Sequence, residues 1–185
     1  MNAQLSHRGG SHGNRFRVAI WSLVAALWLL PVIAMRFTTE MNWSVFDFVF
    51  WALMLGAAGG AYEIATRMSR SSAYRAGFGI AIVGAFALVW ISLAVGIIGD
   101  EDDPANLVFA AVLLTGLIGA AVARLQPQGM AHALVAVAIV QALAVPIAVM
   151  AGSSEGAVLS ACFVALWLGA AQMFRIAARQ SAATA

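Results

Sequence analysis

Six long apolar stretches, separated by short polar gaps, occupy most of this chain. They cover residues 18–35, 45–65, 76–98, 107–123, 131–150 and 157–173. Each is about long enough to cross a ~30 Å hydrocarbon core, which takes roughly 17 to 25 helical residues. The sequence therefore predicts an all-α polytopic membrane protein, with a bundle of six transmembrane helices forming one domain at 17–177.

The arginines are distributed unevenly among the gaps. Nine of the ten precede the first stretch, separate the second from the third, or follow the fourth and the sixth, and Arg36 is the exception. Positive residues that flank membrane helices stay on the cytoplasmic side. Both termini are therefore expected in the cytoplasm. The absence of lysine, together with heavy use of Ala, Gly, Val and Arg, is typical of a GC-rich bacterial genome and predicts the cell inner membrane.

Composition agrees with this class of protein. The chain is 63% hydrophobic and 10% charged, whereas a soluble domain is about a quarter charged. Its net charge of +2 follows from the topology, so the expected partner is the lipid bilayer and not nucleic acid. The polar leader at 1–16 is expected to be disordered, and residues 178–185 to form a cytoplasmic tail.

Small residues recur at four-residue spacing within three predicted helices. The pairs are Gly56 and Gly60, Ala81 and Ala85, and Gly116 and Ala120. Such pairs let helix backbones approach closely, which is how packing is gained in lipid. The short gaps predict that consecutive helices lie beside one another in an up-down bundle.

A polar site is predicted near the outer end of the second helix. Asp47 lies one turn from Trp43 and one turn from Trp51, so all three share a face. A carboxylate between two indoles could hold a polar ligand, and its expected partners are Arg36 and Asn106. The alternative is an interfacial aromatic belt beside a solvated acid.

The deepest strongly polar side chain is Gln141, near the centre of the fifth stretch. An ionisable group inside a bilayer is a functional candidate by default, and no carboxylate reaches the midplane here. This argues against an ion-coupled pump and leaves facilitated transport open.

The remaining candidates for chemistry have simpler explanations. Glu63 and Arg67 are one turn apart and predict an ion pair within one helix. His132 cannot provide bis-histidine haem ligation alone. The acidic run 100–103 could hold a cation, but Asp103 before Pro104 also predicts a helix N-cap. Cys162 is the single cysteine, which excludes an internal disulfide. We therefore expect no enzyme activity and no cofactor or metal.

Several local segments resemble those of a family of small bacterial six-helix membrane proteins. They are residues 93–99, 104–107, 123–124 and 129–131, about a third of the chain with the residues around them. The resemblance implies the six-helix topology and assigns no activity and no catalytic or binding residues.

Two functions fit these observations. The first is a membrane protein that acts through helix–helix contacts, with itself or with another membrane protein, as an assembly factor, a subunit or an envelope-stress protein. The second is a homo-oligomeric permease or channel for a small solute. Convergence of Asp47, Gln141 and Gln172 on one cavity would favour the permease.

Overall fold

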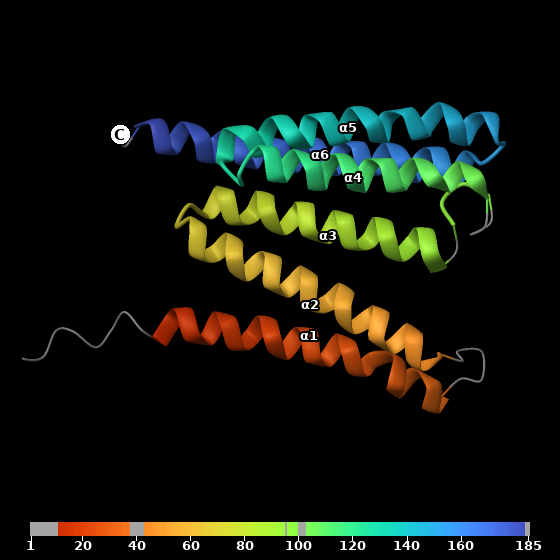
Figure 1. Cartoon of the computed structure of the whole chain (residues 1–185), viewed down its shortest axis with the longest axis horizontal. Coiled ribbons are helices and arrows are strands. Elements are labelled where there is room, and N and C mark those ends of the chain that lie inside the picture. The colour runs from red at the N-terminus through yellow and green to blue at the C-terminus, as the bar shows by residue number, and fades with distance from the viewer. Residues whose placement is uncertain (1–10, 38–42, 95, 100–102, 184–185) are drawn as a thin grey trace, which may run out of the picture. The chain divides into compact units, whose positions relative to one another are not determined.

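The protein is all-α and multi-pass throughout the part that is described. The computed structural model describes residues 11–37, 43–94, 96–99 and 103–183, with the backbone alone for 11–17. This part contains six α-helices, one 3-10 turn and no strand (Figure 1). Each α-helix is long and apolar enough to cross a membrane. The prediction of a six-helix polytopic membrane protein is confirmed.

The helix boundaries differ from the apolar stretches at several ends. The elements are α1 (Ser11–Phe37), α2 (Val45–Met68), α3 (Ser72–Ala94), η1 (Pro104–Asn106), α4 (Leu107–Val122), α5 (Pro127–Met150) and α6 (Ser154–Ala183). The first helix thus begins inside the leader that was expected to be disordered, of which residues 1–10 lie outside the described residues.

Two of these differences have a local cause. α3 ends at Ala94 instead of residue 98, and Gly96 and Gly99 follow with φ angles of 73° and 63°. That left-handed conformation does not continue a helix, and glycine adopts it at little cost. α6 continues to Ala183 because its last turns are rich in Ala, Arg and Gln, which favour helix even beyond the apolar stretch.

The expected N-cap before the fourth helix is confirmed. Asp103 accepts a hydrogen bond from the backbone N–H of Ala105 at 2.8 Å, and Pro104 occupies the first helical position. A carboxylate at this place satisfies a backbone donor that the helix leaves free.

The chain divides into two compact units, Met1–Ile64 and Ala65–Ala185, with the boundary inside α2. In the first unit, α1 contacts α2 through indoles and one glycine. Trp51 Nε1 donates to the Leu27 carbonyl at 3.0 Å, and Trp21 Nε1 donates to the Glu63 carboxylate at 3.2 Å.

The glycine that packs in this unit is Gly59. A methyl group built on it would lie 3.4 Å from Val24, whereas one on Gly56 or Gly60 would meet no described atom within 4 Å. The glycine of α2 that packs against α1 is therefore Gly59, and neither Gly56 nor Gly60 does so. Gly59 and Gly60 are neighbours in the sequence, so they point about 100° apart around the helix axis. The face of α2 that packs on α1 differs from the predicted face by this rotation.

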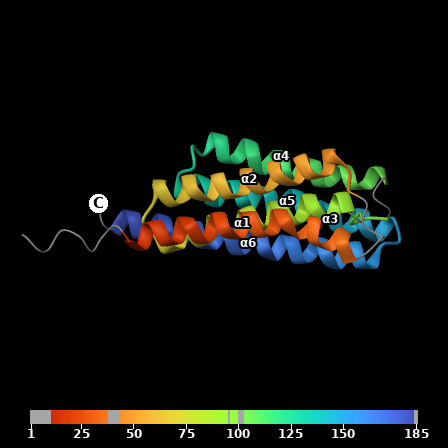
Figure 2. The same ribbon diagram turned by 90° about the horizontal axis from the view of Figure 1, so that it is seen from below.

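In the second unit, α6 packs along α3 and α5, and α5 packs along α4. Figure 2 shows α5 between α4 and α6. Consecutive helices are neighbours for the α4–α5 and α5–α6 pairs, as expected, but α3 and α4 touch at few points. The loop and 3-10 turn that join α3 to α4 allow the two helices to stay apart.

Glycines of α3 allow α6 to lie close against it. A methyl group on Gly77 would lie 3.0 Å from the Phe174 ring, and one on Gly84 would lie 2.5 Å from Leu166. The rings of Tyr74 and Phe174 meet edge to face with centroids 5.2 Å apart. Aromatic pairs in this geometry add to the stability gained by burial.

The closest approach of α4 to α5 is at Gly119. A methyl group there would lie 2.7 Å from the Ala133 methyl and 3.3 Å from its Cα, whereas Gly169 of α6 has open space around it. We predict that Gly119→Ala lowers the free energy of unfolding in detergent by about 1 to 3 kcal/mol relative to Gly169→Ala, because the first must push two backbones apart.

Both substitutions gain the same helix propensity, so the comparison isolates the clash. Equal unfolding free energies for the two variants would show that α4 and α5 do not pack closely at Gly119.

Candidate functional site

The carboxylate of Asp47 caps its own helix. Asp47 Oδ2 accepts from the backbone N–H of Ser44 at 2.7 Å and from its hydroxyl at 2.8 Å, and Ser44 Oγ accepts from the Asp47 N–H at 3.3 Å. This reciprocal pairing is a capping box. Asp47 is exposed, and the described structure shows no ion pair between it and Arg36. Ser44 is close in sequence and provides donors that Arg36 was expected to provide.

The indoles beside Asp47 pack on other rings. Trp43 and Trp51 meet edge to face with centroids 6.0 Å apart, and Trp43 contacts Phe48 at 5.4 Å. Trp51 is 8% exposed and also donates to α1. Trp43, which precedes α2, therefore packs on rings of that helix, and Trp51 joins α2 to α1. No described contact places the carboxylate between them.

Asn106 holds a loop of the second unit. Its Oδ1 accepts from the backbone N–H groups of Ile97 and Ile98 at 3.1 and 3.0 Å, and its Nδ2 donates to the Ile98 carbonyl at 3.1 Å. Ile97 and Ile98 are both buried. Buried backbone groups must be paired, so these bonds give Asn106 a structural role at the α3–α4 connection.

Gln141 is fully buried in the second unit. Its Oε1 accepts from Trp167 Nε1 at 3.5 Å, a long bond, and its Nε2 has no described partner. The hydroxyls of Ser160 and Ser92 are also buried without a described partner. Gln172, by contrast, is exposed on α6. The two glutamines therefore do not converge on one cavity, and Asp47 belongs to the other unit.

Hydrogen bonds tie together the arginine-bearing helix ends at one end of the second unit. Arg75 caps α2 by donating to the carbonyls of Ser69 and Thr66, both at 3.0 Å. The Ser71 hydroxyl donates to Gln180 at 2.9 Å, which ties the start of α3 to the end of α6. The Tyr74 hydroxyl donates to the Leu125 carbonyl at 2.7 Å, which ties α3 to the α4–α5 turn.

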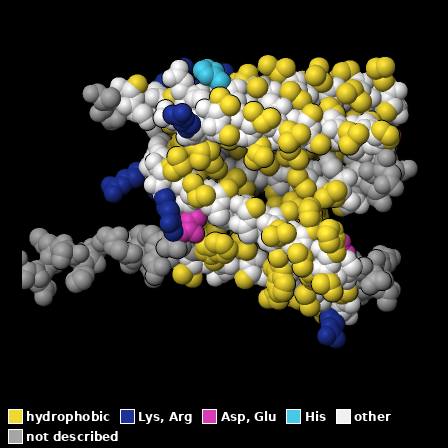
Figure 3. All heavy atoms as spheres, viewed as in Figure 1, with side chains coloured by type: hydrophobic (Ala, Val, Ile, Leu, Met, Phe, Trp, Pro, Cys, Tyr) yellow, Lys and Arg dark blue, Asp and Glu magenta, His cyan; other side chains and the backbone are white. Residues whose placement is uncertain are grey.

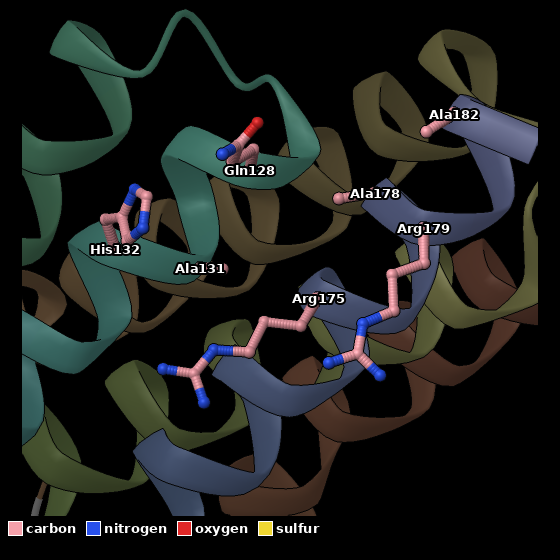
Figure 4. Close-up of a pocket in the computed structure, with 7 residues that line it drawn as sticks. All are labelled: Gln128, Ala131, His132, Arg175, Ala178, Arg179 and Ala182. Carbon is pink, nitrogen blue, oxygen red and sulfur yellow. The ribbon is translucent and has the colours of Figure 1, made fainter. Parts of the chain in front are cut away.

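The same end carries Arg70, Arg124, Arg175 and Arg179. Figure 3 shows hydrophobic side chains over the visible surface of α4 and α5, with arginine side chains toward the end that holds the α4–α5 turn. Two of these arginines lie beside a cavity of about 310 Å³ between the start of α5 and the end of α6 (Figure 4). It is lined by Gln128, Ala131, His132, Arg175, Ala178, Arg179 and Ala182.

Sequence reasoning missed this basic pocket. It considered His132 only as a haem ligand and the arginines of α6 only as topology signals. The described lining is basic and polar, with two arginines, one histidine and one glutamine beside three alanines. Only the antiparallel pairing of α5 with α6 brings the histidine and the two guanidinium groups together.

Comparison of the chain with protein-family models, with curated proteins and with solved structures finds no match. The six-helix membrane architecture is shown by the described residues, and no family is identified for the chain.

We predict that Asn106→Ala lowers the free energy of unfolding by about 2 to 4 kcal/mol, because three hydrogen bonds to a buried loop are lost at about 1 kcal/mol each. Asn106→Asp keeps both acceptor bonds but sets an oxygen against the Ile98 carbonyl in place of the donor, so it should lose less than Asn106→Ala and more than nothing. Reversible unfolding in mixed micelles measures both values. If Asn106→Ala is no worse than Asn106→Asp, the loop does not depend on this side chain.

Proposed function

We propose that this polytopic membrane protein acts through helix–helix contacts within the bilayer, as an assembly factor, a subunit or an envelope-stress protein, and that it associates with itself. The observation that carries the proposal is an exposed stripe of small residues on α6. It consists of Ala161, Ala165 and Gly169, four residues apart and all exposed, with open space around Gly169. Small residues at this spacing are how membrane helices approach one another.

One amide extends the stripe. Gln172 follows Gly169 by three residues, on the same face, and is exposed with no described hydrogen-bond partner. An amide both donates and accepts, so two copies of Gln172 can satisfy each other across a symmetric interface. The hydrocarbon region offers an exposed amide no other partner.

The arginine pattern supports a threading for this assembly. The basic end of the second unit, with Arg70, Arg75, Arg124, Arg175 and Arg179, would face the cytoplasm by the positive-inside rule. We propose the inner membrane of a bacterium, with both chain termini in the cytoplasm. The absence of lysine and the resemblance to small bacterial six-helix membrane proteins support the same location.

A small-solute permease is the second candidate, and one observation favours it. Gln141, Ser160 and Ser92 place polar atoms without described partners inside the second unit. These atoms could line a polar path across the outer half of the unit. We place this function second because Gln141 contacts Trp167 in a closed core and Gln172 lies outside that core.

The single cysteine offers a direct test of self-association. Cys162 is exposed and lies on the same side of α6 as Ala165 and Gly169. We predict that oxidation with copper phenanthroline in native membranes links two chains through Cys162, and that Ala165→Leu sharply reduces this dimer because the larger side chain separates the helices.

Ala136→Leu is the matched control. Ala136 is exposed on α5, about 13 Å from the start of that helix, and Ala165 lies about 15 Å before Arg175, which borders the same end of α5. This control should leave the dimer unchanged. Moving the cysteine to the exposed Leu117 of α4, in a Cys162→Ser background, should give no dimer. Equal cross-linking from Cys162 and from position 117 would mean random collision and would contradict the proposal.

A further inference from the structure

The basic pocket between α5 and α6 has the composition of an anion site. Two guanidinium groups, from Arg175 and Arg179, one imidazole, from His132, and one amide, from Gln128, line it together with three alanines. Among the described residues, no carboxylate belongs to the lining. Neither arginine has a described ion pair, so both remain available to an external anion.

The lining side chains come from two helices, α5 and α6. Figure 4 shows the side chain of Arg175 extending from α6 toward α5, on the side where Ala131 and His132 lie. Gln128 and His132 belong to the first turns of α5. The N-terminus of a helix carries a partial positive charge, which adds to the attraction for an anion.

The pocket also lies at a defined depth. Arg175 is 21 residues after Ser154, the first residue of α6, which places it about 32 Å along the helix axis. A hydrocarbon core is about 30 Å thick. If α6 enters the bilayer near Ser154, Arg175 reaches the opposite boundary, where phospholipid phosphates lie. Arg179, one turn further, lies among the headgroups.

The pocket is held in place by its surroundings. Gln180, next to Arg179, accepts a hydrogen bond from Ser71, and the turn before α5 accepts one from Tyr74. Ala131, on the pocket side of α5, is 2% exposed, and Ala177 of α6 is fully buried. These contacts hold the ends of α5 and α6 that line the pocket.

We propose that this pocket binds the phosphate group of an anionic phospholipid from the inner leaflet. Guanidinium groups suit phosphate because they can donate two parallel hydrogen bonds. Basic pockets between membrane helices on the cytoplasmic side recognise lipid headgroups in this way. The small side chains of Ala131, Ala178 and Ala182 leave room for the headgroup. The inference does not depend on self-association.

The test measures how phosphatidylglycerol binds the purified protein in detergent. Native mass spectrometry counts the phosphatidylglycerol molecules retained per chain over a lipid titration, with phosphatidylcholine as the zwitterionic comparison. We expect one saturable phosphatidylglycerol site per chain. The double variant Arg175→Gln with Arg179→Gln should weaken that site about tenfold or more, because charge-assisted hydrogen bonds are lost.

A matched control removes the same charge from the same end of the unit. Arg70 and Arg124 are exposed and lie outside the pocket lining. Replacing both by Gln should change the affinity less than about threefold, since only screened long-range attraction is lost. Equal weakening by the two double variants would overturn the proposal, because it would show general attraction to a basic surface.

Two further measurements complete the test. Arg175→Lys with Arg179→Lys keeps the charge but loses the planar donor geometry, so its affinity should fall between the wild type and the Gln pair. It also provides a folded comparison if the Gln pair does not fold. Inorganic phosphate in excess should fail to displace phosphatidylglycerol. Full displacement by phosphate would identify a site for a soluble anion and overturn the lipid assignment.

Discussion

Backbone N–H and C=O groups in the hydrocarbon core of a bilayer must find their hydrogen-bond partners within the protein. The other features of this protein depend on that constraint. It makes each membrane crossing a helix and places the charged residues at helix ends. Local hydrogen bonds at the helix ends and in one loop follow from the same constraint. Asp47 and Ser44 pair the free donors at the start of α2, Arg75 pairs the carbonyls at its end, and Asn106 pairs the loop after α3.

With the backbone satisfied, packing between helices depends on how closely they approach. Gly77 and Gly84 let α6 lie against α3, and Gly119 lets α4 lie against α5. These glycines face inward and stabilise the fold. Gly169 is different, because it is exposed on α6 with open space around it. Glycine therefore occurs both where helices pack inside the bundle and on a surface that a second chain can cover.

The sequence alone was sufficient for the features that one helix determines. Six spans follow from six apolar stretches, and the Asp103 cap follows from its position before Pro104. Features that need two helices were not predictable. Four-residue spacing pointed to Gly56, but the rotation of α2 buries Gly59 instead. The basic pocket depends on the register between α5 and α6. The sequence pattern of either helix alone does not determine that register.

Binding of inner-leaflet lipid depends on the threading of the chain, since the arginine-rich end must face the cytoplasm for its pocket to meet that lipid. Ser154, at the start of α6, and Gln128, at the start of α5, are both exposed and lie at opposite ends of the second unit. The measurement is labelling of single cysteines at these positions, in a Cys162→Ser background, with a membrane-impermeant maleimide. We predict that Ser154→Cys is labelled in cells whose inner membrane is intact and that Gln128→Cys is labelled only after that membrane is permeabilised. The reverse pattern would contradict the account.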